Sequence, residues 1–121
     1  AQNTKISGSI IVSTPQDVAL IDARKGINMF KRVDVQVLGL VENMSYFLCD
    51  NCSEKHYIFS KDGVLKEAVK FKIPLLGQIP IDKKLRKQSD DGSPCYFDDP
   101  KSETSKIFLS IAHKLHERLS N

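Results

Sequence analysis

Two short runs of apolar, mostly β-branched residues constrain the fold of this chain more than any other feature of its sequence. "GSIIVST" spans residues 8–14 and "VQVLGLV" spans residues 35–41. Both runs are close to continuous in apolar side chains and do not alternate with polar ones. Strands of this kind are usually covered on both faces, as in the parallel sheets of α/β proteins. The two runs therefore predict buried parallel strands with helices packed on them.

Helical patterns follow both strands. Thr14 is placed to cap a first helix, with Pro15 at its first position. The buried face of this helix would carry Ala19, Ala23, Ile27 and Phe30. Ser60 is placed to cap a second helix after the second strand. The apolar residues expected on that helix are Val64, Leu65, Ala68 and Val69.

The last third of the chain repeats the alternation. "IPLLGQIP" at residues 73–80 predicts a third strand, and a short helix after it should end at the turn of Asp91 and Gly92. Asp99 and Pro100 open a final helix. Its expected buried face consists of Ile107, Phe108, Ile111, Leu115 and Leu119. This order predicts an α/β fold in which right-handed crossovers form a parallel sheet with flanking helices.

A sheet of three strands has only one strand with neighbours on both sides. The chain of 121 residues is one domain at most, and its first strand begins close to the chain start. An exposed apolar edge promotes association. We therefore expect residues 1–121 to form a single partial domain, the C-terminal half of a larger sheet. We also expect that the chain does not remain a well-behaved monomer.

Charge and composition exclude several classes of protein. The formal net charge is +3 and the lysines are scattered, which does not indicate nucleic-acid binding. No apolar run approaches the 18 or so residues of a membrane span. The three cysteines are an odd number, which argues against a complete disulfide framework and favours a reducing compartment.

The most informative segment is "FLCDNCSEKHYIF" at residues 47–59. Cys49 and Cys52 have the spacing at which one tight turn points two thiolates at a single metal centre. A redox pair is the weaker interpretation, because no helical pattern follows the first cysteine to lower its pKa. A purely structural turn is a further alternative. A zinc ribbon would need a second close pair of cysteines, which the sequence lacks.

Further ligands for such a site are scarce. Within one chain, His56 and Cys95 are the nearby candidates by chemistry. His113 and His116 lie three residues apart on the last helix and are expected to be surface residues, while Cys95 is expected to be buried. Two chains meeting across a twofold axis would supply four thiolates, enough for zinc or for a [4Fe–4S] cluster. We therefore predict a metal site between subunits, and the spacing does not choose the metal.

Two polar or turn-forming residues follow the carboxyl ends of predicted strands. Asn43 lies just past the second strand and Pro80 at the end of the third. Ligands of open α/β sheets bind at this edge. Both residues are candidates for a ligand site, although turn formation would also explain them.

Several segments together resemble one family. They are "STPQDVALIDARKGINMF", "VLGLVENMSYFLCDNC", "LLGQIPID" and "LRKQSDDGSPCYF". With these segments the chain resembles, from about Gly8 to Leu119, the C-terminal half of the Mrp-type P-loop ATPases, which are iron–sulfur cluster carriers. "TPQD", "ENMS" and the cysteine pair together are specific to that family.

The resemblance implies a MinD-like P-loop fold with a deviant Walker A motif, and a homodimer that binds ATP and Mg²⁺. It also implies a labile [4Fe–4S] cluster bridged between subunits and passed to recipient apoproteins. Cys49 and Cys52, in a loop at residues 46–57, would be the cluster ligands, and Asn43 and Pro80 would border the adenine. No glycine-rich phosphate loop occurs in the sequence, so we expect this chain alone not to hydrolyse ATP.

Two alternatives to the carrier remain. The first is an interaction module without catalysis, in which zinc bridges the cysteine pairs. The second is a positioning ATPase of the MinD or ParA type, which does not require the cysteine pair. The final helix lacks the basic membrane-targeting face expected of such an ATPase. For the carrier we expect a cytoplasmic location, with the mitochondrial matrix as the alternative, and no nucleic-acid or membrane partner.

Overall fold

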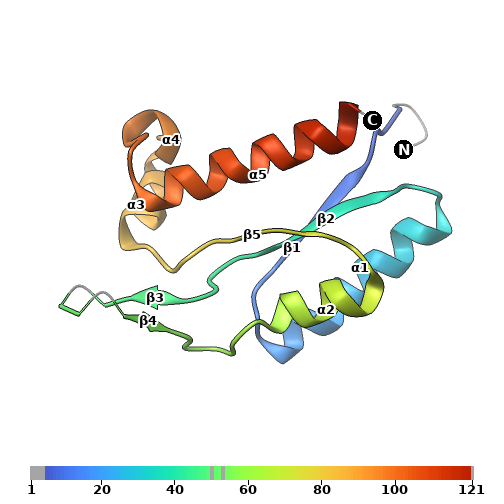
Figure 1. Cartoon of the computed structure of the whole chain (residues 1–121), viewed down its shortest axis with the longest axis horizontal. Coiled ribbons are helices and arrows are strands. Elements are labelled where there is room, and N and C mark those ends of the chain that lie inside the picture. Colours follow the sequence, from blue (N-terminus) through green and yellow to red (C-terminus); the bar gives the residue numbers. More distant parts are fainter. Residues whose placement is uncertain (1–4, 50, 53, 121) are drawn as a thin grey trace.

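The computed structural model describes residues 5–49, 51, 52 and 54–120 (Figure 1). The elements in chain order are β1 (Ser9–Ser13), α1 (Asp17–Arg32), β2 (Val37–Glu42), β3 (Phe47–Leu48), β4 (Lys55–His56), α2 (Gly63–Phe71), β5 (Leu75–Gln78), α3 (Lys83–Asp91), α4 (Cys95–Asp98) and α5 (Glu103–Ser120). The three strands predicted from the apolar runs, β1, β2 and β5, are each followed by a helix as expected, whereas the β3–β4 pair after β2 was not predicted.

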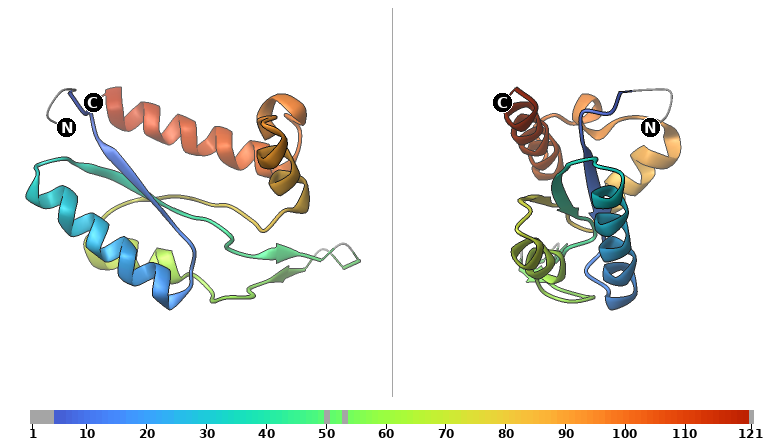
Figure 2. Two further views of the ribbon diagram at one scale, coloured as in Figure 1. Left: turned by 180° about the vertical axis from the view of Figure 1, so that it is seen from behind. Right: turned by 90° about the vertical axis from the view of Figure 1, so that its right-hand side faces the viewer.

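The main sheet is parallel and has the strand order β1-β2-β5. Helices α1 and α2 lie on one face of this sheet and α5 lies on the other (Figures 1 and 2). A separate antiparallel pair, β3 and β4, projects beyond the sheet (Figure 1). The predicted α/β class with flanking helices is therefore confirmed, and β2 is the strand with neighbours on both sides.

The core has two halves because successive side chains of β2 point to opposite faces. Leu40 packs under α1 and α2 with Leu20, Ile27, Val64 and Ala68. Val41 packs under α5 with Leu76, Ile79 and Ile111. Close approach on the α5 side requires glycine, since a Cβ at Gly77 would lie 2.7 Å from Ile111 Cγ1. The core thus fixes the sheet between two layers of helix.

The first helix begins later than predicted. Thr14 does not cap it; its hydroxyl donates to Gln16 Oε1 at 3.0 Å, and α1 starts at Asp17. Pro15 is buried against the start of α2, where a Cβ at Gly63 would lie 2.9 Å from the Pro15 carbonyl oxygen. Pro15 therefore lies before the helix and not at its first position, since Gln16 is the N-cap. Of the predicted buried face, Ala23 and Ile27 are buried, and Ala19 and Phe30 are half-buried.

The prediction that Ser60 caps α2 is also wrong. The helix starts at Gly63, and Asp62 before it adopts a left-handed conformation with φ 58° and no side-chain cap. The backbone N–H of Val64 instead donates to Glu42 Oε2 at 2.8 Å. The cap therefore comes from the end of β2. On the apolar face, Val64 and Ala68 are buried, whereas Leu65 and Val69 are exposed.

One ion pair joins α1 to α2. The Arg24 guanidinium donates to the carboxylate of Glu67, whose side chain is nearly buried. This hydrogen bond holds the pKa of the Glu67 carboxyl below its usual value, against the opposing effect of burial. The Arg24–Glu67 pair is a directional polar contact between α1 and α2, which otherwise pack through apolar side chains.

The last helix buries less of its apolar face than the sequence predicts. Ile111 is buried and Ile107 and Leu115 pack partly against the sheet, but Phe108 and Leu119 are 37% and 52% exposed. α5 packs chiefly on β5 and α4 and only lightly on β2, so the three-stranded sheet covers only part of its apolar face. The short helix α4 was not predicted, and Cys95 at its start is half-buried, not fully buried.

The β1 edge carries exposed apolar side chains. Ile10 and Val12 are 40% and 56% exposed. They lie opposite Gly39 and Val41 of β2, on the face that α5 covers elsewhere. Ile11 points to the other face and packs with the α1 core. An edge strand of this kind favours association with another chain.

We expect the chain to self-associate through β1 in a concentration-dependent manner, measured by light scattering. Val12→Lys should reduce association, because it adds a charge to an exposed edge without touching the core. Val69→Lys, at a 73% exposed position of α2, is the matched control and should leave association unchanged. A monodisperse wild-type monomer at high concentration would contradict the expectation.

Candidate metal centre and the adjoining pocket

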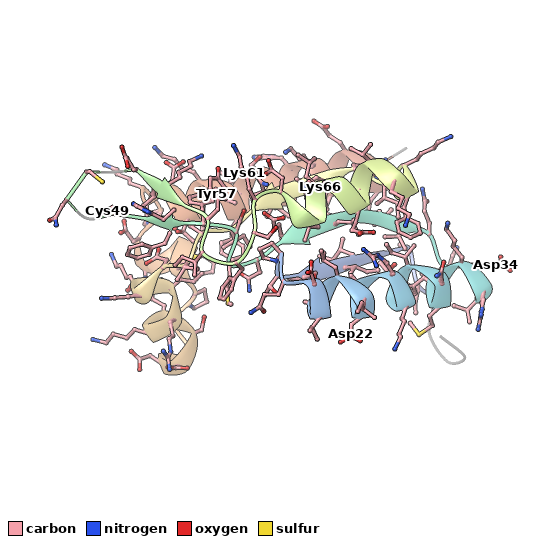
Figure 3. All side chains as sticks on the ribbon, turned by 90° about the horizontal axis from the view of Figure 1, so that it is seen from below. Asp22, Asp34, Cys49, Tyr57, Lys61 and Lys66 are labelled. Atoms are coloured by element: carbon pink, nitrogen blue, oxygen red, sulfur yellow. The ribbon has the colours of Figure 1, made fainter. Side chains whose placement is uncertain are left out.

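The cysteine segment leaves the sheet at the end of β2. Two backbone hydrogen bonds tie its first residues to the end of β5: Ser45 N donates to the Ile79 carbonyl at 2.9 Å, and Ile81 N donates to the Tyr46 carbonyl at 2.7 Å. The chain then forms β3, which pairs with β4. The resulting hairpin extends away from the helices (Figures 1 and 3).

Both motif cysteines lie in the loop of this hairpin. The Cys49 N–H donates to the Glu54 carbonyl at 3.0 Å and closes the loop. Cys49 is half-buried and Cys52 is exposed, and Cys49 lies at the outer end of the molecule in Figure 3. The predicted position of the cysteine turn, between the second strand and the second helix, is confirmed.

The side chain of His56 lies close to those of Cys49 and Cys52. One potential ligand atom from each of Cys49, Cys52 and His56 lies within 4.8 Å of the other two. Of the two additional ligands weighed from the sequence, the structure thus brings in His56 and leaves Cys95 out, at the start of α4. His113 and His116 are exposed on α5, as predicted, and belong to no metal-ligand group within the described residues.

The base of the hairpin is built from tyrosines and lysines. Tyr46 is buried, and its ring centroid lies 6.1 Å from that of Tyr57. The Lys55 ammonium lies 4.7 Å from the Tyr46 ring centroid, and the Lys61 ammonium 5.3 Å from that of Tyr57. Burial raises the pKa of the Tyr46 hydroxyl. Two positive charges therefore sit on the aromatic base of the cysteine hairpin.

Glu42 connects this base to the rest of the fold, a role that the sequence analysis missed. Its fully buried carboxylate accepts from the Ser45 hydroxyl, from Val64 N at 2.8 Å and from Gln78 Nε2 at 3.2 Å. One side chain thus joins the entry to the hairpin, the start of α2 and the end of β5. A glutamate directly after an apolar strand is the only sequence signal for such a junction.

Asn43 and Pro80 line the same cavity. It has a volume of about 460 Å³ and lies at the carboxyl ends of β2 and β5, and Lys83 and Arg86 of α3 also line it. The Asn43 side-chain oxygen accepts from Met44 N at 3.0 Å, so the turn-forming role also holds. The structure therefore brings the two predicted ligand-site residues together; what they bind stays a prediction.

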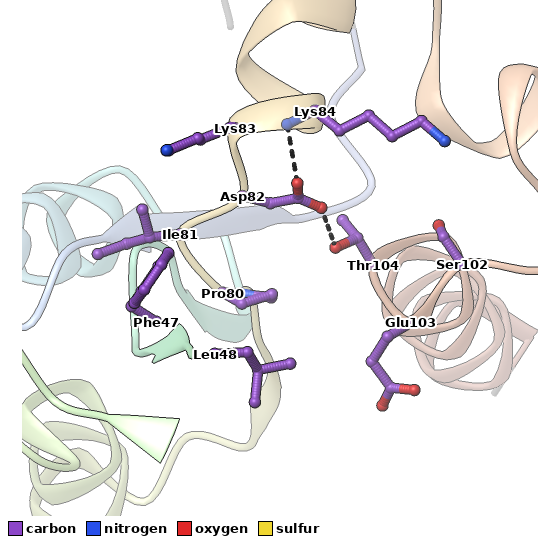
Figure 4. Close-up of a pocket in the computed structure, with 10 residues that line it drawn as sticks. All are labelled: Phe47, Leu48, Pro80, Ile81, Asp82, Lys83, Lys84, Ser102, Glu103 and Thr104. Atoms are coloured by element: carbon purple, nitrogen blue, oxygen red, sulfur yellow. Dashed lines mark hydrogen bonds between the residues drawn. The ribbon is translucent and has the colours of Figure 1, made fainter. Parts of the chain in front are cut away.

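A second cavity, of about 360 Å³, adjoins the first through Pro80, Ile81 and Asp82 (Figure 4). Residues of β3 and the first turns of α3 and α5 close its sides. Asp82 holds this region together, because it accepts from Lys84 N at 2.9 Å and from the Thr104 hydroxyl at 2.9 Å. The residues after β5 thus contact both the strand-end pocket and the cysteine hairpin.

Solved structures share this architecture. The cell division ATPase MinD of Pyrococcus furiosus superimposes with a TM-score of 0.72 at 23% identity, covering 92% of this chain and 43% of MinD. A nucleotide-binding protein from Archaeoglobus fulgidus in complex with ADP superimposes with a TM-score of 0.63 at 38% identity, covering 82% of this chain and 43% of that protein. The fold is that of a MinD-like P-loop NTPase, with a cysteine-bearing hairpin beside its sheet.

Residues 1–116 match the model of the ParA family described as NUBPL iron-transfer P-loop NTPase. The chain belongs to this family, which confirms the resemblance to the Mrp-type proteins inferred from the sequence.

Curated relatives agree with the family match. The chain is 47% identical, over its whole length, to the iron–sulfur cluster transfer protein NUBPL of Mus musculus. It is 48% identical, over 95% of its length, to the "Iron-sulfur protein required for NADH dehydrogenase, mitochondrial" of Arabidopsis thaliana. The iron–sulfur cluster carrier protein of Aquifex aeolicus is 45% identical over 97% of the chain. The chain spans 38%, 37% and 32% of the length of these three relatives.

None of the helices in the described part of the chain combines the length and apolarity needed to cross a bilayer.

Proposed function

We propose that this chain is part of an ATP-dependent iron–sulfur cluster carrier, which binds a labile [4Fe–4S] cluster and passes it to recipient apoproteins. The observation that carries the proposal is the projecting hairpin with Cys49 and Cys52 in its loop. Thiolates are the protein ligands of such clusters. The printed names of the relatives, which are cluster carrier and transfer proteins, support the same function.

The proposed cluster is shared between two chains. Two thiolates from one hairpin are half of the usual four-cysteine set, and a second copy of the chain supplies the other half. A cluster held in this way lies at the edge of each subunit, where Cys52 is exposed. Small changes in the relative position of the subunits would weaken its ligation. A carrier needs this lability in order to release its cargo.

Charge at the hairpin base favours this cargo. A [4Fe–4S] cluster with four thiolate ligands carries net negative charge. Lys55 and Lys61 place two ammonium groups on the tyrosines at the base of the hairpin. Positive charge close to an anionic centre stabilises it, and more strongly at low ionic strength. This effect would be present in both subunits of the dimer.

For the whole protein we propose that Asn43 and Pro80 border the adenine of ATP, with Mg²⁺ bound elsewhere. The 460 Å³ cavity that both residues line supports this role. Residues 79–81 at its edge are hydrogen-bonded to residues 45 and 46, which lead into the cysteine hairpin. Nucleotide binding would therefore bias the position of the cluster ligands. The chain itself, without a phosphate loop, should not hydrolyse ATP.

The test is anaerobic reconstitution with ferrous iron and sulfide, followed by transfer. We expect a brown protein with one cluster per two chains, which then activates an added apoenzyme that requires a [4Fe–4S] cluster. A protein that stays colourless and assembles no cluster would contradict the carrier, and one zinc ion bound per two chains would support the zinc-bridged module. The carrier is proposed to act in the cytoplasm or the mitochondrial matrix.

A further inference from the structure

We propose that Cys49, Cys52 and His56 of a single chain form a three-ligand site for one divalent transition-metal ion, with a fourth coordination position left open. The site uses the two thiolates of the proposed cluster site but needs neither a second chain nor a cluster. It adds an imidazole ligand that the proposed cluster site does not use.

The register of the hairpin explains why His56 faces the cysteines. In β3 and β4, Phe47 lies directly opposite His56, and Leu48 lies opposite Lys55. Side chains directly opposite each other share one face of a pair, and side chains two residues apart along a strand share it as well. Cys49 follows Phe47 by two residues, so it is directed to the face of His56. Lys55 points to the other face, over Tyr46.

The distances suit a single ion. The three potential ligand atoms lie within 4.8 Å of one another. Around a tetrahedral ion with metal–sulfur bonds of about 2.3 Å, neighbouring ligand atoms lie about 3.8 Å apart. The ligand atoms therefore need to approach by about 1 Å at most. Cys52 and His56 are exposed, so side-chain rotation can supply this movement without disturbing the core.

The donor set defines the class of ion. Two thiolates and one imidazole favour zinc, cobalt(II) or iron(II) over magnesium and calcium, which prefer oxygen ligands. Three protein ligands with one open position are typical of sites that exchange a ligand, whereas closed structural zinc sites have four. An ion bound here is therefore accessible to a small molecule or to a ligand from another protein.

The single-ion site and the shared cluster exclude each other. Both use Cys49 and Cys52, and the ion site adds His56 from the same chain, whereas the cluster adds two cysteines from a second chain. Divalent ions should therefore compete with cluster assembly. The inference does not depend on the cluster function, because the ligand geometry belongs to one chain.

Cobalt(II) is the probe for the test, added under anaerobic conditions to the 121-residue chain. We expect one cobalt ion per chain, with intense visible bands of tetrahedral coordination and with thiolate-to-cobalt charge transfer. His56→Gln should weaken binding at least roughly tenfold, since loss of a residue that only hydrogen-bonds to a metal ligand already costs about 10–100-fold, and should shift the visible bands. His113→Gln, an exposed histidine on α5, is the matched control and should bind as the wild type does.

Three results would overturn the proposal: unchanged cobalt affinity and spectrum in His56→Gln, one cobalt ion per two chains, or binding without thiolate charge transfer. Circular dichroism of both variants excludes loss of the fold as the cause. Cluster reconstitution on the wild type separates this inference from the proposed function. If the wild type assembles a cluster and His56→Gln binds cobalt as the wild type does, only the single-ion site is refuted. Cobalt binding without cluster assembly refutes only the carrier.

Discussion

Replacing Cys49 with serine should abolish cluster binding, and replacing Cys52 should have the same effect. In a dimer that shares one cluster, a single substitution removes two of the four thiolates, and a serine hydroxyl does not replace them. The loss should therefore be nearly complete and not graded. Iron and sulfide bound per chain, together with the visible charge-transfer absorption after anaerobic reconstitution, measure the effect.

Cys95→Ser is the matched control and should leave cluster binding nearly intact. Cys95 begins α4, outside the group formed by the hairpin cysteines and His56. Its contact with Ser105 uses the Cys95 backbone carbonyl, which accepts from the Ser105 hydroxyl at 3.0 Å, and the substitution preserves it. Equal loss of iron in Cys95→Ser and Cys49→Ser would show that the cluster ligands have been assigned wrongly.

The sequence predicts the sheet well because its signals are local and repeated. Apolar runs around Ile11 and Leu40 indicate buried strands, and these strands pair in parallel with the register Ile11 opposite Leu40. The same reasoning predicts an incompletely covered edge, and Val12 is indeed exposed there. The assignment of residues 1–121 as one half of a larger domain stays a prediction.

Long-range contacts are what the sequence does not predict. Ser60 is a plausible local cap for α2, but the N–H of Val64 finds its acceptor in Glu42, 22 residues earlier. The two-residue strands of the hairpin are too short to give a periodic pattern. The position of His56 relative to Cys49 follows from that pairing and not from spacing. From the sequence, His56 is therefore a candidate ligand by its chemistry alone. The register of the hairpin is what places it near Cys49.

Glu42→Ala should destabilise the chain strongly and should also weaken metal and cluster binding at a hairpin that Glu42 does not touch directly. The substitution leaves the buried Ser45 hydroxyl and Val64 N–H without their acceptor, while the Gln78 amide keeps its hydrogen bond to Asp62 Oδ1 at 2.9 Å. A buried donor without a partner costs about 1–3 kcal/mol. The expected loss is therefore about 2 kcal/mol or more, against a typical total stability of about 5–15 kcal/mol. Denaturant unfolding followed by far-UV circular dichroism measures it.

Two further variants show whether the acceptor itself matters. Glu42→Gln keeps the shape and one acceptor oxygen, which can still receive the Val64 N–H while the Ser45 hydroxyl rotates to accept from the new amide. It should lose much less stability than Glu42→Ala and keep most of its metal binding.

Glu54→Ala changes an exposed glutamate in the hairpin and should be close to wild type in stability. If Glu42→Ala unfolds at the wild-type denaturant concentration, the buried carboxylate does not hold β2, α2 and the hairpin together. If it is destabilised but binds metal normally in its folded state, the junction stabilises the fold without positioning the cysteines.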